Sequence, residues 1–138
     1  MLLVKTKLGV SSIEGIGLFA DEFIQYGRVV WKYGPLIDIR IAPEDLPGLA
    51  EAARRLIEKY SYREESSGLY LLCGDDARFF NHSPDPNCID VAHGDESDVT
   101  RARRDIYPGE EMTCDYSLFD ADFVEGKMRA ACGRAFSF

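Results

Sequence analysis

The sequence predicts a mostly β (α+β) fold made of several short strands with one inserted helix. Short apolar and β-branched runs are separated throughout by Gly, Pro, Asn and Asp, which is typical of strands joined by tight turns. One segment, residues 43–60, instead repeats its apolar residues at helical spacing. With 138 residues and 46% hydrophobic side chains, the chain is expected to form a single domain with its own core, spanning residues 1–138.

The β-rich runs are short and are spread along the whole chain. In order, the expected strands are Leu2–Lys5, Leu18–Ala20, Arg28–Tyr33, Leu36–Ile41, Leu69–Leu72, Ile89–Ala92, Val99–Ala102 and Glu111–Cys114. Residues 107–110 place Pro108 and Gly109 at the two central positions of a type II turn. His93-Gly94-Asp95-Glu96 reads as the end of a hairpin, and we prefer this acidic turn to a metal cluster completed by Asp98.

The expected helix begins after Pro43, where Glu44 and Asp45 place carboxylates in the first turn. Basic residues gather towards the other end, as the helix dipole favours. One face is apolar, at Leu46, Leu49, Ala53, Leu56, Ile57 and Tyr60. The pattern therefore predicts a helical insert at about 43–60.

The net charge of −8 argues against direct binding to a nucleic-acid backbone, which normally requires a basic patch. The acidic balance suits a basic peptide, although an acidic surface also serves solubility alone. No apolar run approaches membrane-spanning length, and the first residues lack the pattern of a secretory signal. The four cysteines form no C-x-x-C pair and are expected to be reduced thiols. We expect a cytoplasmic location in a bacterium, and otherwise a nuclear or host-cell one.

Four motifs carry the functional prediction. They are GIGLFA (15–20), GRVVWKY (27–33), ARFFNHSPDPN (77–87) and ARRDIYPGEEMTCDY (102–116). Alone, a G-x-G turn says little, and the proline-rich third motif could be a strand that ends in a loop. In this order and at these separations, the motifs resemble the SET-domain protein lysine methyltransferases. The resemblance is to a minimal, bacterial- or viral-like member of that family and covers most of the chain.

The resemblance implies a fold of small curved β-sheets with a knot-like C-terminal crossing, where the Asn-His segment packs against the later Asp-Tyr segment. It also implies S-adenosylmethionine as the methyl donor. By resemblance, the residues that contact this cofactor are Gly15, Ile16, Gly17, Leu18, Phe80, Asn81 and His82. Glycine in the turn would let the backbone approach the cofactor without a Cβ in the way.

The resemblance also implies a substrate channel that ends at tyrosine hydroxyls. Tyr116 matches the catalytic tyrosine of the family, and Tyr33 matches a tyrosine that lines the lysine channel, with a half-buried strand tyrosine as the alternative. Cys114 stands where relatives carry Phe or Tyr, a position that helps to set how many methyl groups a lysine receives. Either Cys114 or a residue elsewhere, Tyr62 or Tyr70, is expected to control the product here.

The tail departs from the family. Many relatives bind zinc through a cysteine after Asn-His-Ser and a cysteine-rich tail, whereas this chain has Pro84 at the first place and only Cys132 in a degenerate tail at about 117–138. A closed structural zinc site needs four ligands, so no metal is expected. The tail is expected either to close over the channel through Phe136 and Phe138 or to fray.

The sequence thus predicts a protein-lysine N-methyltransferase that uses S-adenosylmethionine. Its expected partner is a basic, lysine-containing protein or peptide, which could be histone-like, ribosomal or another. The oligomeric state stays open, with a homodimer among the alternatives. The competing hypothesis is a catalytically silent module that keeps the fold and binds a basic peptide or a partner protein.

Overall fold

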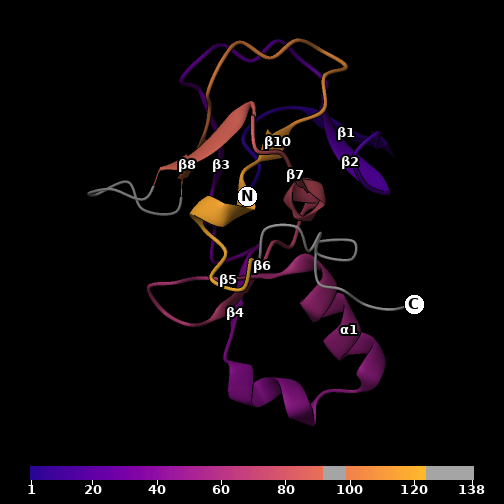
Figure 1. Cartoon of the computed structure of the whole chain (residues 1–138), viewed down its shortest axis with the longest axis vertical. Coiled ribbons are helices and arrows are strands. Elements are labelled where there is room, and N and C mark those ends of the chain that lie inside the picture. Colours follow the sequence, from indigo (N-terminus) through magenta and orange to yellow (C-terminus); the bar gives the residue numbers. More distant parts are fainter. Residues whose placement is uncertain (92–98, 124–138) are drawn as a thin grey trace.

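The computed structural model describes residues 1–91 and 99–123, which form four small β-sheets around a shared core (Figure 1). The mostly β prediction is confirmed. One antiparallel sheet pairs β1 (Thr6–Val10) with β2 (Ile16–Ala20). Two three-stranded sheets follow the orders β3-β9-β8 and β4-β6-β5. Their strands are β3 (Val29–Lys32), β4 (Ile39–Ile41), β5 (Tyr62–Arg63), β6 (Tyr70–Leu72), β8 (Cys88–Val91) and β9 (Val99–Ala102).

The fourth sheet joins two segments that lie far apart in the sequence. Strand β7 (Asn81–His82) pairs in parallel with β10 (Thr113–Cys114), so that Asn81 lies beside Thr113 and His82 beside Cys114. The backbone N–H of Ser83 then donates to the carbonyl of Cys114 at 3.0 Å. The predicted packing of the Asn-His segment against the Asp-Tyr segment is therefore confirmed.

The helical insert is divided into two helices. A 3₁₀ helix covers Pro43–Gly48, and α1 covers Glu51–Tyr60. The single helix expected over 43–60 is wrong, because Pro47 lacks the N–H that a continuous α-helix requires and Ala50 is extended, with ψ 146°. Within residues 1–91 and 99–123, no helix is long and apolar enough to cross a membrane.

The predicted turn at residues 107–110 forms as expected. Gly109 has φ +89°, and the N–H of Glu110 donates to the carbonyl of Tyr107 at 3.0 Å, which is the geometry of a type II turn. The hairpin end predicted at 93–96 lies outside the described residues, but β8 and β9 on either side of it pair antiparallel.

The first strand begins later than expected. Leu2 makes only an isolated bridge to Trp31, and the paired strand is Thr6–Val10, whose residues are mostly exposed. Its partner β2 sends Leu18 and Ala20 into the core, where both are fully buried. The core is completed by Ile24, Val30, Leu71, Ile106 and Met112, which also have no exposed surface.

Candidate active site

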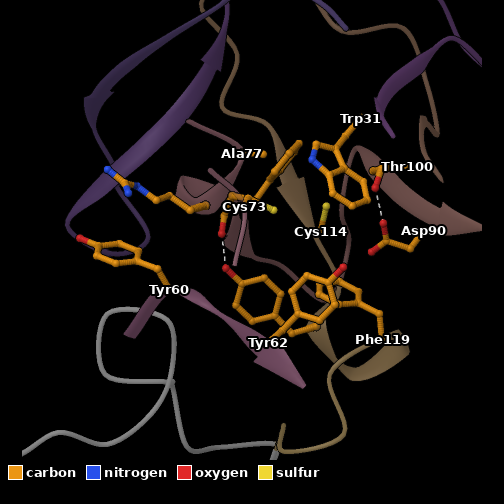
Figure 2. Close-up of a pocket in the computed structure, with 12 residues that line it drawn as sticks. Trp31, Tyr60, Tyr62, Cys73, Ala77, Asp90, Thr100, Cys114 and Phe119 are labelled. Atoms are coloured by element: carbon orange, nitrogen blue, oxygen red, sulfur yellow. Dashed lines mark hydrogen bonds between the residues drawn. The ribbon is translucent and has the colours of Figure 1, made fainter. Parts of the chain in front are cut away.

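Two pockets lie on either side of Tyr60 and Arg78, which line both of them. The first, here named the aromatic pocket, has a free volume of about 50 Å³ and is walled mainly by Trp31, Tyr62, Phe80, Tyr116 and Phe119 (Figure 2). The second, named the turn pocket, has a free volume of about 150 Å³. Gly15, Ile16 and Asn81 line it, opposite α1 and the short helix at Asp76–Phe79.

Tyr116 is fixed at the aromatic pocket by backbone as well as side-chain contacts. It opens a 3₁₀ turn, Tyr116–Leu118, where the carboxylate of Asp115 accepts the N–H of Ser117 at 3.0 Å. Its phenol is 6% exposed and donates to the backbone carbonyl of Phe80. Since the hydroxyl proton is used on that carbonyl, the phenol oxygen acts as an acceptor towards any further group.

His82 supports Tyr116 from the neighbouring strand. The backbone N–H of Tyr116 donates to Nδ1 of His82 at 3.1 Å. Nδ1 also lies 3.7 Å from the carboxylate of Asp115, but an atom that accepts an N–H cannot carry the proton that this ion pair would need. The shorter contact from Tyr116 therefore places the ring proton of His82 on Nε2.

Asn81 ties the glycine turn to Glu111, in the segment just before β10. Its side-chain nitrogen lies 3.1 Å from the carbonyl of Glu14, 3.0 Å from Oγ of Ser11 and 2.9 Å from Oε2 of Glu111. Ser11 in turn donates to Glu111 at 2.8 Å. Asn81 is buried, so its amide mainly holds the wall of the turn pocket in place.

Gly17 is required by this network for a steric reason. A Cβ at this position would meet Oε2 of Glu111 at 2.6 Å, so only glycine lets that carboxylate reach Ser11 and Asn81. The expected close approach at Gly17 therefore exists, but here it serves a carboxylate of the protein itself.

The structure brings together only some of the predicted site residues. Gly15, Ile16 and Asn81 line the turn pocket, while Tyr116, Cys114, Tyr62 and Phe80 line the aromatic pocket. His82 contacts Tyr116, and Leu18 is fully buried in the core.

Tyr33 and Tyr70 line neither pocket. The ring of Tyr33 lies 3.9 Å beneath the guanidinium of Arg40, and the hydroxyl of Tyr70 lies 3.3 Å from the carboxylate of Asp122. Tyr33 also packs against the hydrophobic core. Their predicted channel roles gain no support from the geometry and stay predictions.

The described cysteines are buried free thiols. Burial raises the pKa of Cys88 to about 12 and also raises the pKa values of Cys73 and Cys114. Among residues 1–91 and 99–123, no group of His, Cys, Asp and Glu side chains is arranged to hold a metal ion. Cys132 and the tail phenylalanines lie outside these residues, so the absence of zinc and the lid remain predictions.

Sequence reasoning missed several residues that shape the two pockets. Arg78 and Glu111 stand inside motifs already singled out, and the charge of Arg78 between Ala77 and Phe79 was an available signal, whereas Glu111 is one of several charged residues in its motif. Trp31, Asp90 and Thr100 come from β3, β8 and β9 and meet only because these strands are neighbours in one sheet. Nothing in their local sequence indicates that meeting.

Comparison with known proteins independently supports the family resemblance of the four motifs. The family model described as the SET domain matches residues 15–117. The Drosophila melanogaster protein named Histone-lysine N-methyltransferase trr is 33% identical over an alignment of 130 residues, and the match covers 91% of this chain and 5% of that relative. A Cryptococcus neoformans protein named as a histone-lysine N-methyltransferase specific for H3 lysine 4 is 33% identical over an alignment of 117 residues, and the match covers 78% of this chain and 8% of that relative.

A solved structure also resembles this fold. It is a Polycomb Repressive Complex 2 of Chaetomium thermophilum, in an autoinhibited conformation and bound to S-adenosylmethionine. The match has a TM-score of 0.59 at 26% identity, and it covers 86% of this chain and 16% of the other. The chain thus spans only a small part of the length of these relatives.

Proposed function

Because the chain belongs to the SET-domain family, we propose that it transfers methyl groups from S-adenosylmethionine to the side-chain amine of lysine in a protein. One observation carries this proposal: the turn pocket and the aromatic pocket share Tyr60 and Arg78 in their linings, and the predicted catalytic Tyr116 lines the aromatic one. A methyl donor in one pocket and an amine in the other would have to come into direct contact beside these two shared side chains.

The turn pocket has the polar groups that the amino-acid end of S-adenosylmethionine needs. Nε of Arg78 is buried and has no hydrogen-bond partner among the described residues, so a carboxylate is a suitable ligand for it. Lys59 and Glu14 line the same pocket. Their opposite charges match the carboxylate and the ammonium group of the amino-acid end of the cofactor. When bound there, the cofactor would supply a methyl group on a sulfonium sulfur.

The aromatic pocket suits the apolar stem and the amine of a lysine. A lysine with a free pKa of about 10.4 is almost fully protonated at neutral pH and then has no lone pair with which to attack. Aromatic walls exclude water and disfavour the charged form. The phenol oxygen of Tyr116 can accept an N–H of the amine and so orient its lone pair, which is the positional part of catalysis.

The substrate is proposed to be a basic protein. Relatives carry the name of histone-lysine methyltransferases, and the charge of −8 of this chain favours lysine- and arginine-rich partners. Histones are therefore the first candidates, with ribosomal and other basic proteins as further ones.

The test is a methyl-transfer assay in which the full chain, isotope-labelled S-adenosylmethionine and a panel of histones, ribosomal proteins and basic peptides are combined. We expect label on lysine in at least one member of the panel. If the chain binds the cofactor by calorimetry but labels nothing, the silent binding module becomes the better account.

A further inference from the structure

Three neighbouring strands present polar groups to the aromatic pocket. Trp31 on β3 lies beside Thr100 on β9, and Thr100 lies beside Asp90 on β8. The hydroxyl of Thr100 donates to the carboxylate of Asp90, and all three residues line the cavity (Figure 2). In the same view, Asp90 lies on the opposite side of the pocket from Tyr60.

Within residues 1–91 and 99–123, no cation balances the charge of the Asp90 carboxylate: its pKa reflects burial and the hydrogen bond from Thr100 alone. The guanidinium of Arg78 stacks on Tyr60 and Phe79, 5.4 and 5.2 Å from their ring centres. Burial raises the pKa of Asp90 to about 6, as expected for a carboxylate surrounded by apolar groups.

Nε1 of Trp31, in the same wall, is also buried without a hydrogen-bond partner among the described residues. Buried polar groups are almost always paired, so this unpaired N–H, in a residue that lines the same cavity as Asp90, indicates a polar ligand. The carboxylate of Asp90 decides the sign of that ligand's charge, because an anion that is partly buried among apolar groups favours a cation beside it.

We propose that Asp90 is the group that receives the lysine side chain: its carboxylate binds the ammonium and takes one proton from it. This role rests on the proposed function and adds to it a group that accepts a proton from the lysine ammonium. Neither the four motifs nor the family resemblance pointed to this residue.

The proton balance is simple. One proton moves from Nζ of the lysine to an Oδ of Asp90, which leaves a neutral amine with its lone pair and a neutral carboxyl group. Two neutral groups cost less to keep in an apolar pocket than an ion pair, so burial favours this transfer. The carboxyl group returns its proton to solvent after the methylated product leaves.

Ammonium binding can be measured without any methyl transfer. Trp31 is the only tryptophan of the chain, so its fluorescence reports occupancy of the aromatic pocket. We expect n-butylammonium to change this fluorescence at neutral pH and to bind more tightly than 1-butanol at matched ionic strength. Asp90→Asn should weaken n-butylammonium binding about tenfold or more and leave 1-butanol binding unchanged, because a charge-assisted contact is lost.

Asp21→Asn is the matched control, because the side chain of Asp21 is 53% exposed and contacts only Lys7, at 4.0 Å. It should bind n-butylammonium as the parent does. Asp90→Ser provides a second, smaller uncharged side chain in case Asn packs badly, and circular dichroism checks that each variant is folded. Equal n-butylammonium affinity in the parent and in a folded Asp90 variant would overturn the proposal.

Proton acceptance is tested by the pH dependence of methyl transfer. The other titratable or charged side chains that line the pocket or flank Asp90 on its strand are those of Tyr60, Tyr62, Cys73, Arg78, Cys88, Cys114 and Tyr116. The thiols have raised pKa values and stay protonated at neutral pH, so Asp90 is the base among them.

Asp90→Asn should lower turnover at neutral pH, and the deficit should shrink as pH rises towards about 10.4, where lysine arrives already neutral. A deficit of constant size at every pH would overturn proton acceptance. If the parent transfers no methyl group at all, the proposed function fails, while the fluorescence titration still decides whether Asp90 binds an ammonium.

Discussion

At the scale of single residues, the charged carboxylate of Asp90 lowers the stability of the fold at neutral pH but supplies the aromatic pocket with an acidic group. Its pKa is about 6 in the folded protein against 3.8 for an exposed aspartate, so the folded state binds more protons than the unfolded state between these values. Stability linked to Asp90 is therefore present below pH 3.8 and is lost as pH rises to about 6. A group that lowers stability at neutral pH and lines a cavity is a candidate for function.

Asp90→Asn is expected to stabilise the protein in a pH-dependent way. Asparagine resembles the protonated carboxyl group, so the gain should be small near pH 3.5 and should approach roughly 3 kcal/mol above pH 7, at about 1.4 kcal/mol per pKa unit. Urea unfolding of parent and variant at both pH values measures it. A variant equally or less stable at the higher pH would show that burial of this charge carries no such cost.

Cys114 is the other residue whose size matters in the pocket. It is 3% exposed and lines the aromatic pocket, and burial raises its pKa, so it acts as a small neutral side chain. Cys114→Tyr should fill space beside the amine and shift products from di- or trimethyllysine towards monomethyllysine, as read by mass spectrometry. An unchanged product distribution in a variant that melts like the parent would move this control to another residue, such as Tyr62.

At the scale of elements, the glycine turn, β7 and the segment before β10 are joined through Asn81 and Glu111. Because the amide of Asn81 contacts Ser11, Glu14 and Glu111, its removal affects both the shape of the turn pocket and the stability of the fold.

Asn81→Ala is therefore expected to weaken S-adenosylmethionine binding and to lower the free energy of unfolding, each by about 1–3 kcal/mol. Calorimetry gives the first value and urea unfolding the second. Ser11→Ala removes a hydroxyl of the same network but no atom that lines the turn pocket, so it should lower the free energy of unfolding with a smaller loss of cofactor affinity. Full cofactor affinity in a folded Asn81→Ala protein would remove this residue from the site.

The elements differ in how well their residues predicted them. Alternation or composition was enough for β3, β8 and β9 and for the turn at Gly109, because each is a local pattern. Strands β5 and β7 have two residues each, which is too short for any periodicity. In the helical insert, apolar spacing hid the break that Pro47 introduces.

The residues of the site divide in the same way, into those that a local motif identifies and those that only tertiary packing brings together. Asn81 and Tyr116 were found because they lie within motifs, whereas Asp90 lies outside all four motifs and reaches Trp31 only because both strands pair with β9. Tyr33, although it stands in a motif, is stacked under Arg40. A motif identifies which residues matter in a family, but the cavity they share depends on the tertiary packing.

At the scale of the whole molecule, the charge of −8 should act on substrate encounter. For a lysine- and arginine-rich peptide, kcat/KM is expected to fall as salt rises, because attraction between exposed charges fades over about 8 Å at physiological ionic strength. Steady-state kinetics at several NaCl concentrations, with a neutral lysine peptide as the control substrate, measures the effect. A flat profile for the basic peptide would leave the charge as a solubility feature.

Methyl transfer is proposed to take place in the aromatic pocket, with Tyr116 at its wall. Tyr116→Phe removes one oxygen and keeps the ring, so cofactor affinity should be unchanged and stability should fall only by the roughly 1 kcal/mol of one hydrogen bond to Phe80. Tyr107→Phe, on a tyrosine that is 58% exposed and stacks on Phe23, is the matched control.

The most direct measurement is the single-turnover rate of methyl transfer to a lysine peptide that the parent accepts. We expect Tyr116→Phe to lose about a hundredfold or more in this rate, the scale of a lost positioning contact at the reacting centre, and Tyr107→Phe to match the parent. A Tyr116→Phe protein that binds S-adenosylmethionine and transfers the methyl group at nearly the parent's rate would contradict the account.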